Sequence, residues 1–143
     1  MVLISEDLYR EMEDIPHLGY LLSFAVAADD PRLTYPAVPQ SVKKALDIAG
    51  LKLKDIDLIE IQEAFAAQAL ADAKLMGLSK NEIESKVNVN GSGISLGHPI
   101  AATGTMRMIT LLNEMKRRKA RFGLVTICGG GGQGMTAIVE NVS

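Results

Sequence analysis

The amino-acid sequence predicts an α/β fold: a mixed, mainly parallel sheet of five strands that is covered by helices on both faces. Short apolar segments alternate with helical segments of ten or more residues, as strands and crossover helices do in a parallel sheet. The last two apolar segments are joined only by a short glycine run, which favours an antiparallel pair. We expect residues 1–143 to form one domain, because a chain with 48% hydrophobic residues can bury a compact core.

The chain starts with a short apolar run, Val2–Ile4, that leads into a predicted helix. Ser5 is a suitable N-cap for this helix, which should extend to about Met12. A linker at residues 13–17, which contains a proline, should end it.

A strand and a second helix are predicted next. The segment Gly19–Ala28 is nearly continuous in apolar residues, with aromatic and β-branched members, which indicates a strand buried on both faces. The proline-rich loop Pro31–Pro39 then leads into a helix that has Pro39 in its first turn and ends at Gly50.

The middle of the chain predicts another strand, Asp57–Ile61, which continues directly into a helix from Glu63 to Met76. Gly77 is a favourable end for that helix. The segment Ser79–Lys86 indicates a short polar helix or a turn.

Glycine dominates the last part of the chain. The predicted elements there are a turn at Asn88–Gly97, a long helix from Pro99 to about Lys119, a strand at Phe122–Cys128, the run Gly129–Gly134 and a strand at Met135–Glu140. Ten of the thirteen glycines fall between Gly91 and Gly134. This concentration indicates turns with unusual dihedral angles, or a backbone that another molecule approaches closely.

Composition and charge disfavour several classes of protein. The formal net charge of −2 comes from interspersed signs, and the basic cluster Lys116–Arg121 complements the carbonyl end of the long helix, so nucleic-acid binding is disfavoured. One cysteine cannot form an internal disulfide, and two histidines offer few soft ligands for a metal. No apolar run approaches the roughly 18 residues that span a bilayer, and the first residues do not resemble a signal peptide. We expect a cytoplasmic protein.

Nucleotide binding is disfavoured for both glycine segments. The turn Gly91–Gly97 resembles a dinucleotide fingerprint, but its spacing differs by one residue, and the following strand ends in Cys128 where an acidic residue would hold the ribose. The run Gly129–Gly134 lacks the Lys-Ser/Thr pair of a P-loop and leads into a strand instead of a helix.

Two side chains beside the glycines are candidates for proton transfer. His98 precedes a predicted helix start, where unsatisfied amides favour a neutral imidazole that can accept a proton from a thiol; a simple helix cap is an equal alternative. Cys128 ends an apolar strand before a backbone of glycines, which suggests an activated thiol beside amides that can hold negative charge. An apolar core residue is the alternative for Cys128. The other histidine, His17, lies in a linker and should only be solvated.

The third candidate is the strand-to-helix corner that starts at Gln62. Open α/β sheets bind ligands outside the carboxyl ends of their strands, and this corner, His98 and Cys128 should all lie at that edge. We therefore expect the imidazole and the thiol to meet at one rim of the sheet.

These three stretches together resemble the C-terminal half of a thiolase, the family that makes or cleaves 3-ketoacyl-CoA. Asn88–Pro99 resembles the Asn-Gly-Gly-(x)n-Gly-His-Pro block of the family, Cys128–Gly134 its Cys-x-Gly-Gly-Gly block, and Gln62–Phe65 its Asn-Glu-Ala-Phe block. The order of the blocks and the helices between them also agree, and the resemblance extends from about Val2 to Glu140.

The resemblance implies a role for each matched residue. His98 would activate the nucleophilic thiol and help to hold the thioester oxygen, and Cys128 would remove or return the α-proton of acetyl-CoA. The amide of Gly130 would contribute to the second oxyanion site, and Gln62 would replace an asparagine that orients a water in the first. The remaining matched residues, Ala64 and Phe65, would line the pantetheine and acyl pocket. CoA thioesters would be substrates, and no further cofactor is implied.

Two departures from the family pattern shape the functional prediction. Gln62 is one methylene longer than the asparagine it replaces, so its amide either reaches the oxygen that pairs with His98 or displaces the water. The acylated cysteine, second histidine and CoA-binding loop of the family belong to its N-terminal half and have no counterpart here. The resemblance therefore implies an acetyl-CoA acetyltransferase-like acyltransferase in which this chain is the C-terminal subunit or fragment, inactive without an N-terminal partner and part of a homo- or hetero-oligomer. The alternative is a non-catalytic acyl-CoA-binding or scaffold subunit.

Overall fold

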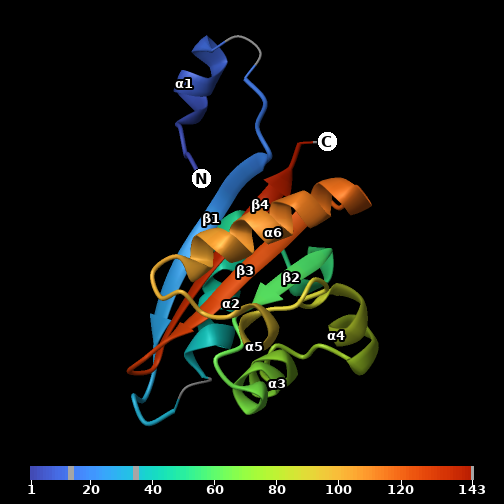
Figure 1. Ribbon diagram of the computed structural model, residues 1–143. Coiled ribbons are helices and arrows are strands. Elements are labelled where there is room, and N and C mark those ends of the chain that lie inside the picture. The colour runs from blue at the N-terminus through green and yellow to red at the C-terminus, as the bar shows by residue number, and fades with distance from the viewer. Residues whose placement is uncertain (13–14, 34–35, 143) are drawn as a thin grey trace.

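The computed structural model describes residues 1–12, 15–33 and 36–142 (Figure 1). Its helices are α1 (Glu6–Glu11), α2 (Ala37–Ala49), the 3-10 helix η1 (Leu53–Asp55), α3 (Ala66–Leu75), α4 (Lys80–Lys86), α5 (Gly93–Leu96) and α6 (Thr103–Arg118). Its strands are β1 (Gly19–Ala28), β2 (Leu58–Ile61), β3 (Phe122–Gly129) and β4 (Gln133–Asn141). Residues 13–14 of the predicted linker and 34–35 of the predicted proline-rich loop lie outside the described residues.

The α/β class is confirmed. The strands form one mixed sheet in the order β1-β4-β3-β2, in which β4 is antiparallel to both neighbours and β2 is parallel to β3. Three of the four strands therefore run in the same direction. The described residues form four strands and not five: Val2–Ile4 stands exposed outside the sheet, and beyond β2 a single parallel bridge between Ile59 and Val87 extends it.

Helices cover both faces of the sheet, as predicted. In Figure 1, α6 crosses in front of the sheet and α2 lies behind it. Alternate strand residues supply the two cores. The core under α2 includes Val38, Val42, Ala45, Ile59, Ile61, Leu124 and Ile138, and the core under α6 includes Leu58, Met108, Leu111, Met115, Val125 and Val139. Because β2 lies between both cores, all four of its residues are buried.

The prediction that β1 is buried on both faces is wrong. Its residues alternate: Ala25 and Ala27 are buried on the side of α2, whereas Phe24 and Val26 are 69% and 50% exposed on the other side. The cause is the position of the strand. β1 is an edge strand next to β4, and α6 packs mainly on β3 and β2.

Two helices begin later than predicted. The helix α3 starts at Ala66 and not at Glu63, because the side chain of Gln68 accepts hydrogen bonds from the amides of Ala64 and Phe65 and holds them outside the helix. The helix α6 starts at Thr103 and not at Pro99. A turn precedes it, in which Ala101 has a positive φ of 69°. His98 therefore lies on a loop before α6 and not, as predicted from the sequence, directly before its first residue.

Other predicted features agree with the structure. Ser5 caps α1 by accepting from the amide of Leu8, and Gly50 ends α2 with a φ of 68°. In the basic cluster at the end of α6, Arg117 and Arg118 both pair with Glu114. No helix among residues 1–12, 15–33 and 36–142 is both long and apolar enough to cross a bilayer.

Two acidic side chains are buried, Glu60 on β2 and Asp72 on α3. Burial raises the pKa of each carboxyl group to about 7, against the attraction of Arg107 at Glu60 and a hydrogen bond from Gln68 at Asp72. Each group therefore holds its proton more tightly in the folded chain than in the unfolded chain. The free energy of unfolding should fall as the pH rises from about 4 to about 7, where the unfolded chain has already lost these protons.

We expect the chain to unfold at a lower temperature at about pH 8 than at about pH 5, and Asp72→Asn to reduce this difference. One such group changes the free energy of unfolding by on the order of a few kcal/mol between these two pH values. Thermal unfolding followed by circular dichroism measures the unfolding temperature at each pH. Glu82→Gln is the control, because hydrogen bonds from Ser79 lower the pKa of Glu82 to about 2, so its contribution changes only at lower pH. An Asp72→Asn variant with the same difference in unfolding temperature as the wild type would contradict the prediction.

Candidate functional site

The corner between β2 and α3 is held by a buried arginine. Gln62 directly follows β2 and is 1% exposed, and its side-chain Oε1 accepts a hydrogen bond of 3.3 Å from Nε of Arg107. Arg107, on α6, is fully buried and also donates from Nη2 to the carbonyl of Gly97 at 3.1 Å. One side chain thus connects Gln62 to the loop that carries His98.

Sequence reasoning missed Arg107. A signal was present, because Arg107 lies four residues after Thr103 and four before Leu111, on the buried side of α6. An arginine in the apolar stripe of a predicted helix must find partners inside the protein. The hydrogen bond from Arg107 also fixes the orientation of the Gln62 amide: Oε1 is the bonded end, and Nε2 is buried without a partner among the described residues.

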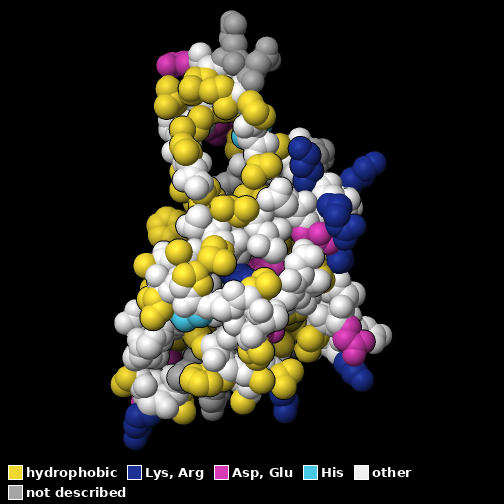
Figure 2. All heavy atoms as spheres, viewed as in Figure 1, with side chains coloured by type: hydrophobic (Ala, Val, Ile, Leu, Met, Phe, Trp, Pro, Cys, Tyr) yellow, Lys and Arg dark blue, Asp and Glu magenta, His cyan; other side chains and the backbone are white. Residues whose placement is uncertain are grey.

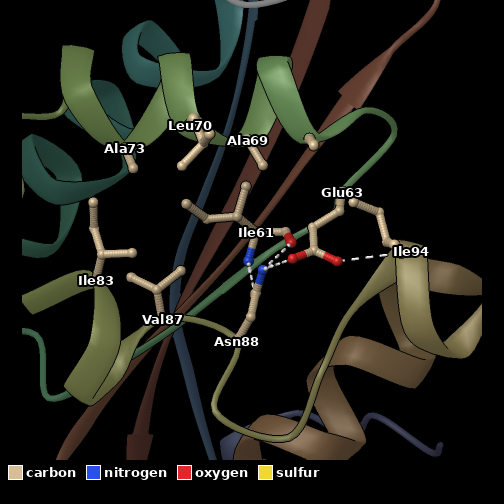
Figure 3. Close-up of a pocket in the computed structure, with 10 residues that line it drawn as sticks. Ile61, Glu63, Ala69, Leu70, Ala73, Ile83, Val87, Asn88 and Ile94 are labelled. Atoms are coloured by element: carbon tan, nitrogen blue, oxygen red, sulfur yellow. Dashed lines mark hydrogen bonds between the residues drawn. The ribbon is translucent and has the colours of Figure 1, made fainter. Parts of the chain in front are cut away.

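Glu63 joins the same corner to the glycine-rich turn (Figure 3). Its Oε1 accepts from Nδ2 of Asn88 at 3.3 Å, and its Oε2 accepts from the amide of Ile94 at 3.2 Å. Asn88 in turn exchanges two hydrogen bonds with the backbone of Ile61. The turn before His98 is therefore fixed to the end of β2 by side chains on both sides.

An apolar hollow of about 330 Å³ lies beside Glu63, between α3 and α4. Figure 3 shows Leu70 and Ala73 of α3 facing Ile83 of α4 and Val87, which directly follows α4, with the Glu63 carboxylate at one end of the hollow. Ala64 and Phe65, which we predicted to line a substrate pocket, do not line this hollow. Both are exposed at the corner, Phe65 by 65%.

His98 lies on the exposed loop before α6, and its ring forms a side-chain hydrogen bond with Thr103. Its Nδ1 is 2.8 Å from Oγ1 of Thr103, which is 2% exposed, and that hydroxyl also donates to the carbonyl of Pro99 at 3.0 Å. The loop therefore holds the ring by its Nδ1 side.

Cys128 is half-buried near the end of β3, opposite Gly134 of β4. It packs against the core under α2. Burial raises the pKa of the thiol, the negative charge of Asp72 raises it further, and a hydrogen bond with its own backbone opposes them. The activated thiol that we expected would have a lowered pKa, so the environment within this chain acts in the opposite direction.

The glycines after Cys128 shape the β3–β4 turn. Gly131 and Gly132 have φ values of 82° and 77°, which side chains other than glycine rarely adopt. Gly134 lies so close to the start of α2 that a Cβ atom there would be 2.5 Å from the carbonyl oxygen of Ala37. Gly130 is exposed and faces open space, so another molecule can approach its backbone.

The Gln62 corner and the start of α6 both contact β3 close to Cys128. The amide of Gln62 donates to Thr126 of β3, two residues before Cys128. The start of α6 packs on the same strand, where a Cβ atom on Gly104 would be 3.3 Å from Cδ1 of Ile127. Within the described residues no hydrogen bond joins His98 to Cys128, whose thiol faces the core under α2. Among those residues there is also no group of three His, Cys, Asp or Glu side chains suited to a metal ion.

An apolar surface adjoins this edge. A hollow of about 300 Å³ between β1, β3, β4 and the start of α6 is lined by Met1, Phe24, Met108, Ile127 and Met135, among others. Phe24 and Met135 are 69% and 56% exposed. Figure 2 shows hydrophobic side chains along the side formed by β1 and the N-terminal segment, whereas basic side chains gather at the end of α6.

Known proteins resemble this chain over nearly all of its length. The family described as "Thiolase, C-terminal domain" matches residues 15–141. The beta-ketothiolase BktB of Cupriavidus necator is 45% identical over 141 residues, which is 99% of this chain and 35% of that protein. The acetyl-CoA acetyltransferase of Escherichia coli is 45% identical over 126 residues, 88% of this chain and 31% of that protein.

Solved structures of thiolases and acetyl-CoA acetyltransferases are also similar to this chain. The Bacillus anthracis acetyl-CoA acetyltransferase has a TM-score of 0.89 and 38% identity, covering 97% of this chain and 34% of that one. Human mitochondrial 3-ketoacyl-CoA thiolase in complex with CoA has a TM-score of 0.89 and 34% identity, covering 96% and 34%. The chain thus spans about a third of the length of the proteins it matches.

Proposed function

We propose, from the premise that this chain belongs to the thiolase family and corresponds to its C-terminal domain, that it supplies one part of a CoA-dependent acyltransferase. A second part, which corresponds to the remaining two-thirds of the relatives, would carry the nucleophilic cysteine. The observation that carries this proposal is the family match over residues 15–141, supported by the hydrogen bonds that join the Gln62 corner to β3 and, through Arg107, to the loop of His98. The reaction proposed is the formation or thiolytic cleavage of acetoacetyl-CoA-like 3-ketoacyl-CoA.

The chemistry divides between the two parts. His98 accepts the proton of the partner's thiol, and the acyl group then passes from CoA to that thiol. Cys128 then removes the α-proton of acetyl-CoA, and the exposed amide of Gly130 holds negative charge on the thioester oxygen. The side-chain amide of Gln62 would take the place of the family asparagine at the first oxyanion site, and Ala64 and Phe65 would contact the pantetheine arm. No metal or further cofactor is needed.

The test is reconstitution of thiolysis. The chain is co-expressed with the N-terminal two-thirds of Cupriavidus necator BktB, and the CoA-dependent loss of acetoacetyl-CoA is followed by absorbance. We expect activity from the pair and none from either part alone. Activity of this chain alone would reject the requirement for a partner, and a stable pair without activity would reject the catalytic proposal.

A scaffold role is the second candidate, and the raised pKa of the Cys128 thiol favours it. In this case the chain binds acyl-CoA and stabilises the complex without proton transfer. Alkylation by iodoacetamide separates the two: a catalytic thiol in the complex should react faster than glutathione at the same pH, and a scaffold thiol should react more slowly. His98→Ala should abolish activity in the first case and weaken only assembly in the second.

We also propose that the apolar surface around Phe24 and Met135 is the docking face for the partner. Isolated monomers rarely expose contiguous apolar patches of this kind. The edge strand β1 has no charged residue that would discourage association. We therefore expect the isolated chain to self-associate in solution.

Phe24→Glu should reduce self-association of the isolated chain and weaken binding of the BktB part, because a carboxylate would be desolvated at the contact. Light scattering after size exclusion gives the first result, and co-purification gives the second. Ile48→Glu is the matched control, since Ile48 is 65% exposed on α2, on the opposite face. A well-behaved monomeric wild type, or an equal effect of Ile48→Glu, would contradict the proposed docking face.

A further inference from the structure

The contact between His98 and Thr103 determines which ring nitrogen carries the proton. The Thr103 hydroxyl lies 2.8 Å from Nδ1 of His98 and 3.0 Å from the carbonyl oxygen of Pro99. A hydroxyl has one proton to donate, and a carbonyl can only accept. Both contacts are hydrogen bonds only when the hydroxyl donates to Pro99 and accepts a proton held on Nδ1. The opposite arrangement leaves two oxygen atoms facing each other at 3.0 Å with no hydrogen between them.

The other nitrogen is then the basic one. A neutral imidazole has a single N–H, so a proton on Nδ1 leaves the lone pair on Nε2. Within the described part of the chain no residue forms a hydrogen bond with Nε2, and His98 lies on an exposed loop. The lone pair on Nε2 is therefore left without a hydrogen-bond donor from the described residues, on an exposed residue.

The hydroxyl of Thr103 is not needed to hold the turn itself. The amides of Ala102 and Thr103 already donate to the Pro99 carbonyl at 2.9 and 3.0 Å. These bonds remain when the hydroxyl is removed. The contact that only the buried hydroxyl supplies is therefore the hydrogen bond with the imidazole of His98.

We propose that Thr103 is a positioning residue that sets the tautomer of His98, so that Nε2 is presented as a proton acceptor. This inference rests on the proposed function for its role in catalysis, but the tautomer does not depend on it. Before the acyl group is transferred, the S–H bond of the partner's thiol breaks, and its proton forms an N–H bond at Nε2. The products of this proton transfer are a thiolate, which can then attack the acyl-CoA, and an imidazolium, which still donates from Nδ1 to Thr103.

The tautomer can be measured in the isolated chain by nitrogen-15 NMR of the histidine side chains at about pH 9, above the usual titration range of imidazole. The chain contains two histidines, and His17→Gln assigns the signals, so His17 is an internal reference. We expect the Nδ1–H form for His98 in the wild type and in Thr103→Ser, and a shift towards the Nε2–H form in Thr103→Val. Thr105→Val, at an exposed position of the same helix, is the matched control and should leave the signals unchanged.

An Nε2–H signal for His98 in the wild type would overturn the proposal, and so would an unchanged Nδ1–H signal in a folded Thr103→Val variant. In the reconstituted enzyme, Thr103→Val should lower kcat at least about tenfold with little change in KM, and Thr103→Ser should restore kcat, because a wrong tautomer cannot accept the proton. If the wild-type pair shows no thiolysis while the NMR result holds, the proposed function fails and the assignment of the tautomer stands.

Discussion

Replacing Cys128 with serine in the reconstituted two-part enzyme should lower kcat for acetoacetyl-CoA thiolysis by about 100- to 10,000-fold. A positioned acid or base contributes a factor of this size, and a serine hydroxyl titrates far above the working pH. The measurement is the steady-state rate of the purified complex. The substitution is nearly isosteric, so co-purification and melting temperature should match the wild type and serve as the folding control. A Cys128→Ser complex with wild-type kcat would favour the scaffold alternative.

The pH–rate profile of an Asp72→Asn variant is a second test of the role of Cys128. Burial and Asp72 both raise the pKa of the Cys128 thiol, so the thiolate forms only as the pH rises through that raised value. Asp72→Asn removes one of the two causes and should shift the thiolate-dependent limb of the pH–rate profile to lower pH. Glu82→Gln, at a partly exposed position of α4, should leave the limb in place. A limb that does not move with Asp72→Asn would mean that another group titrates there.

Replacing Arg107 with methionine should destabilise the isolated chain by about 3–5 kcal/mol. Arg107 is fully buried, and its loss leaves the Oε1 of Gln62 and the carbonyl of Gly97 without these donors. It also removes the positive charge that attracts the buried Glu60 carboxylate. Loss of one member of such a buried charged network usually has an effect of this size, because the remaining polar groups stay desolvated. Urea unfolding followed by circular dichroism gives the free energy.

A double substitution tests whether charge is the cause. Arg107→Met combined with Glu60→Gln removes both charges and should recover part of the lost stability, because an uncharged amide is easier to bury than an unpaired carboxylate. Met106→Ala, one position away and 37% exposed, should have a much smaller effect. Additive effects of the two substitutions, with no recovery, would show that Glu60 and Arg107 are not coupled.

Most elements of the fold could be predicted from local patterns. Apolar runs gave β2, β3 and β4, Ser5 and Gly50 marked helix ends, and the class followed from the alternation of strands and helices. The predicted start of α3 was wrong because the side chain of Gln68 binds the preceding amides, and the predicted start of α6 was wrong because a turn with a positive φ at Ala101 precedes it. Periodicity does not contain that information, because a capping side chain acts through its conformation and not through its hydrophobicity.

Fewer features of the candidate site than of the fold could be predicted from the sequence. The motifs around Gln62, His98 and Cys128 were visible because glycine, histidine and cysteine are informative at such positions. Arg107 was not found, since its importance comes from contacts with Gln62 and Gly97, which are 45 and 10 residues away in the chain. The direction in which the pKa of Cys128 is shifted was also missed, because it depends on burial and on Asp72 of another element.

The sequence by itself determined the α/β class, the order of the elements and the resemblance to the thiolase C-terminal half, because these depend on local periodicity and on short motifs. Only the tertiary structure decided that β1 is an edge strand with one uncovered apolar face, that Arg107 connects two loops, and that Thr103 holds the ring of His98. The physical reason is that strand order, burial and side-chain hydrogen bonds depend on which distant residues meet, and a one-dimensional pattern does not specify those meetings.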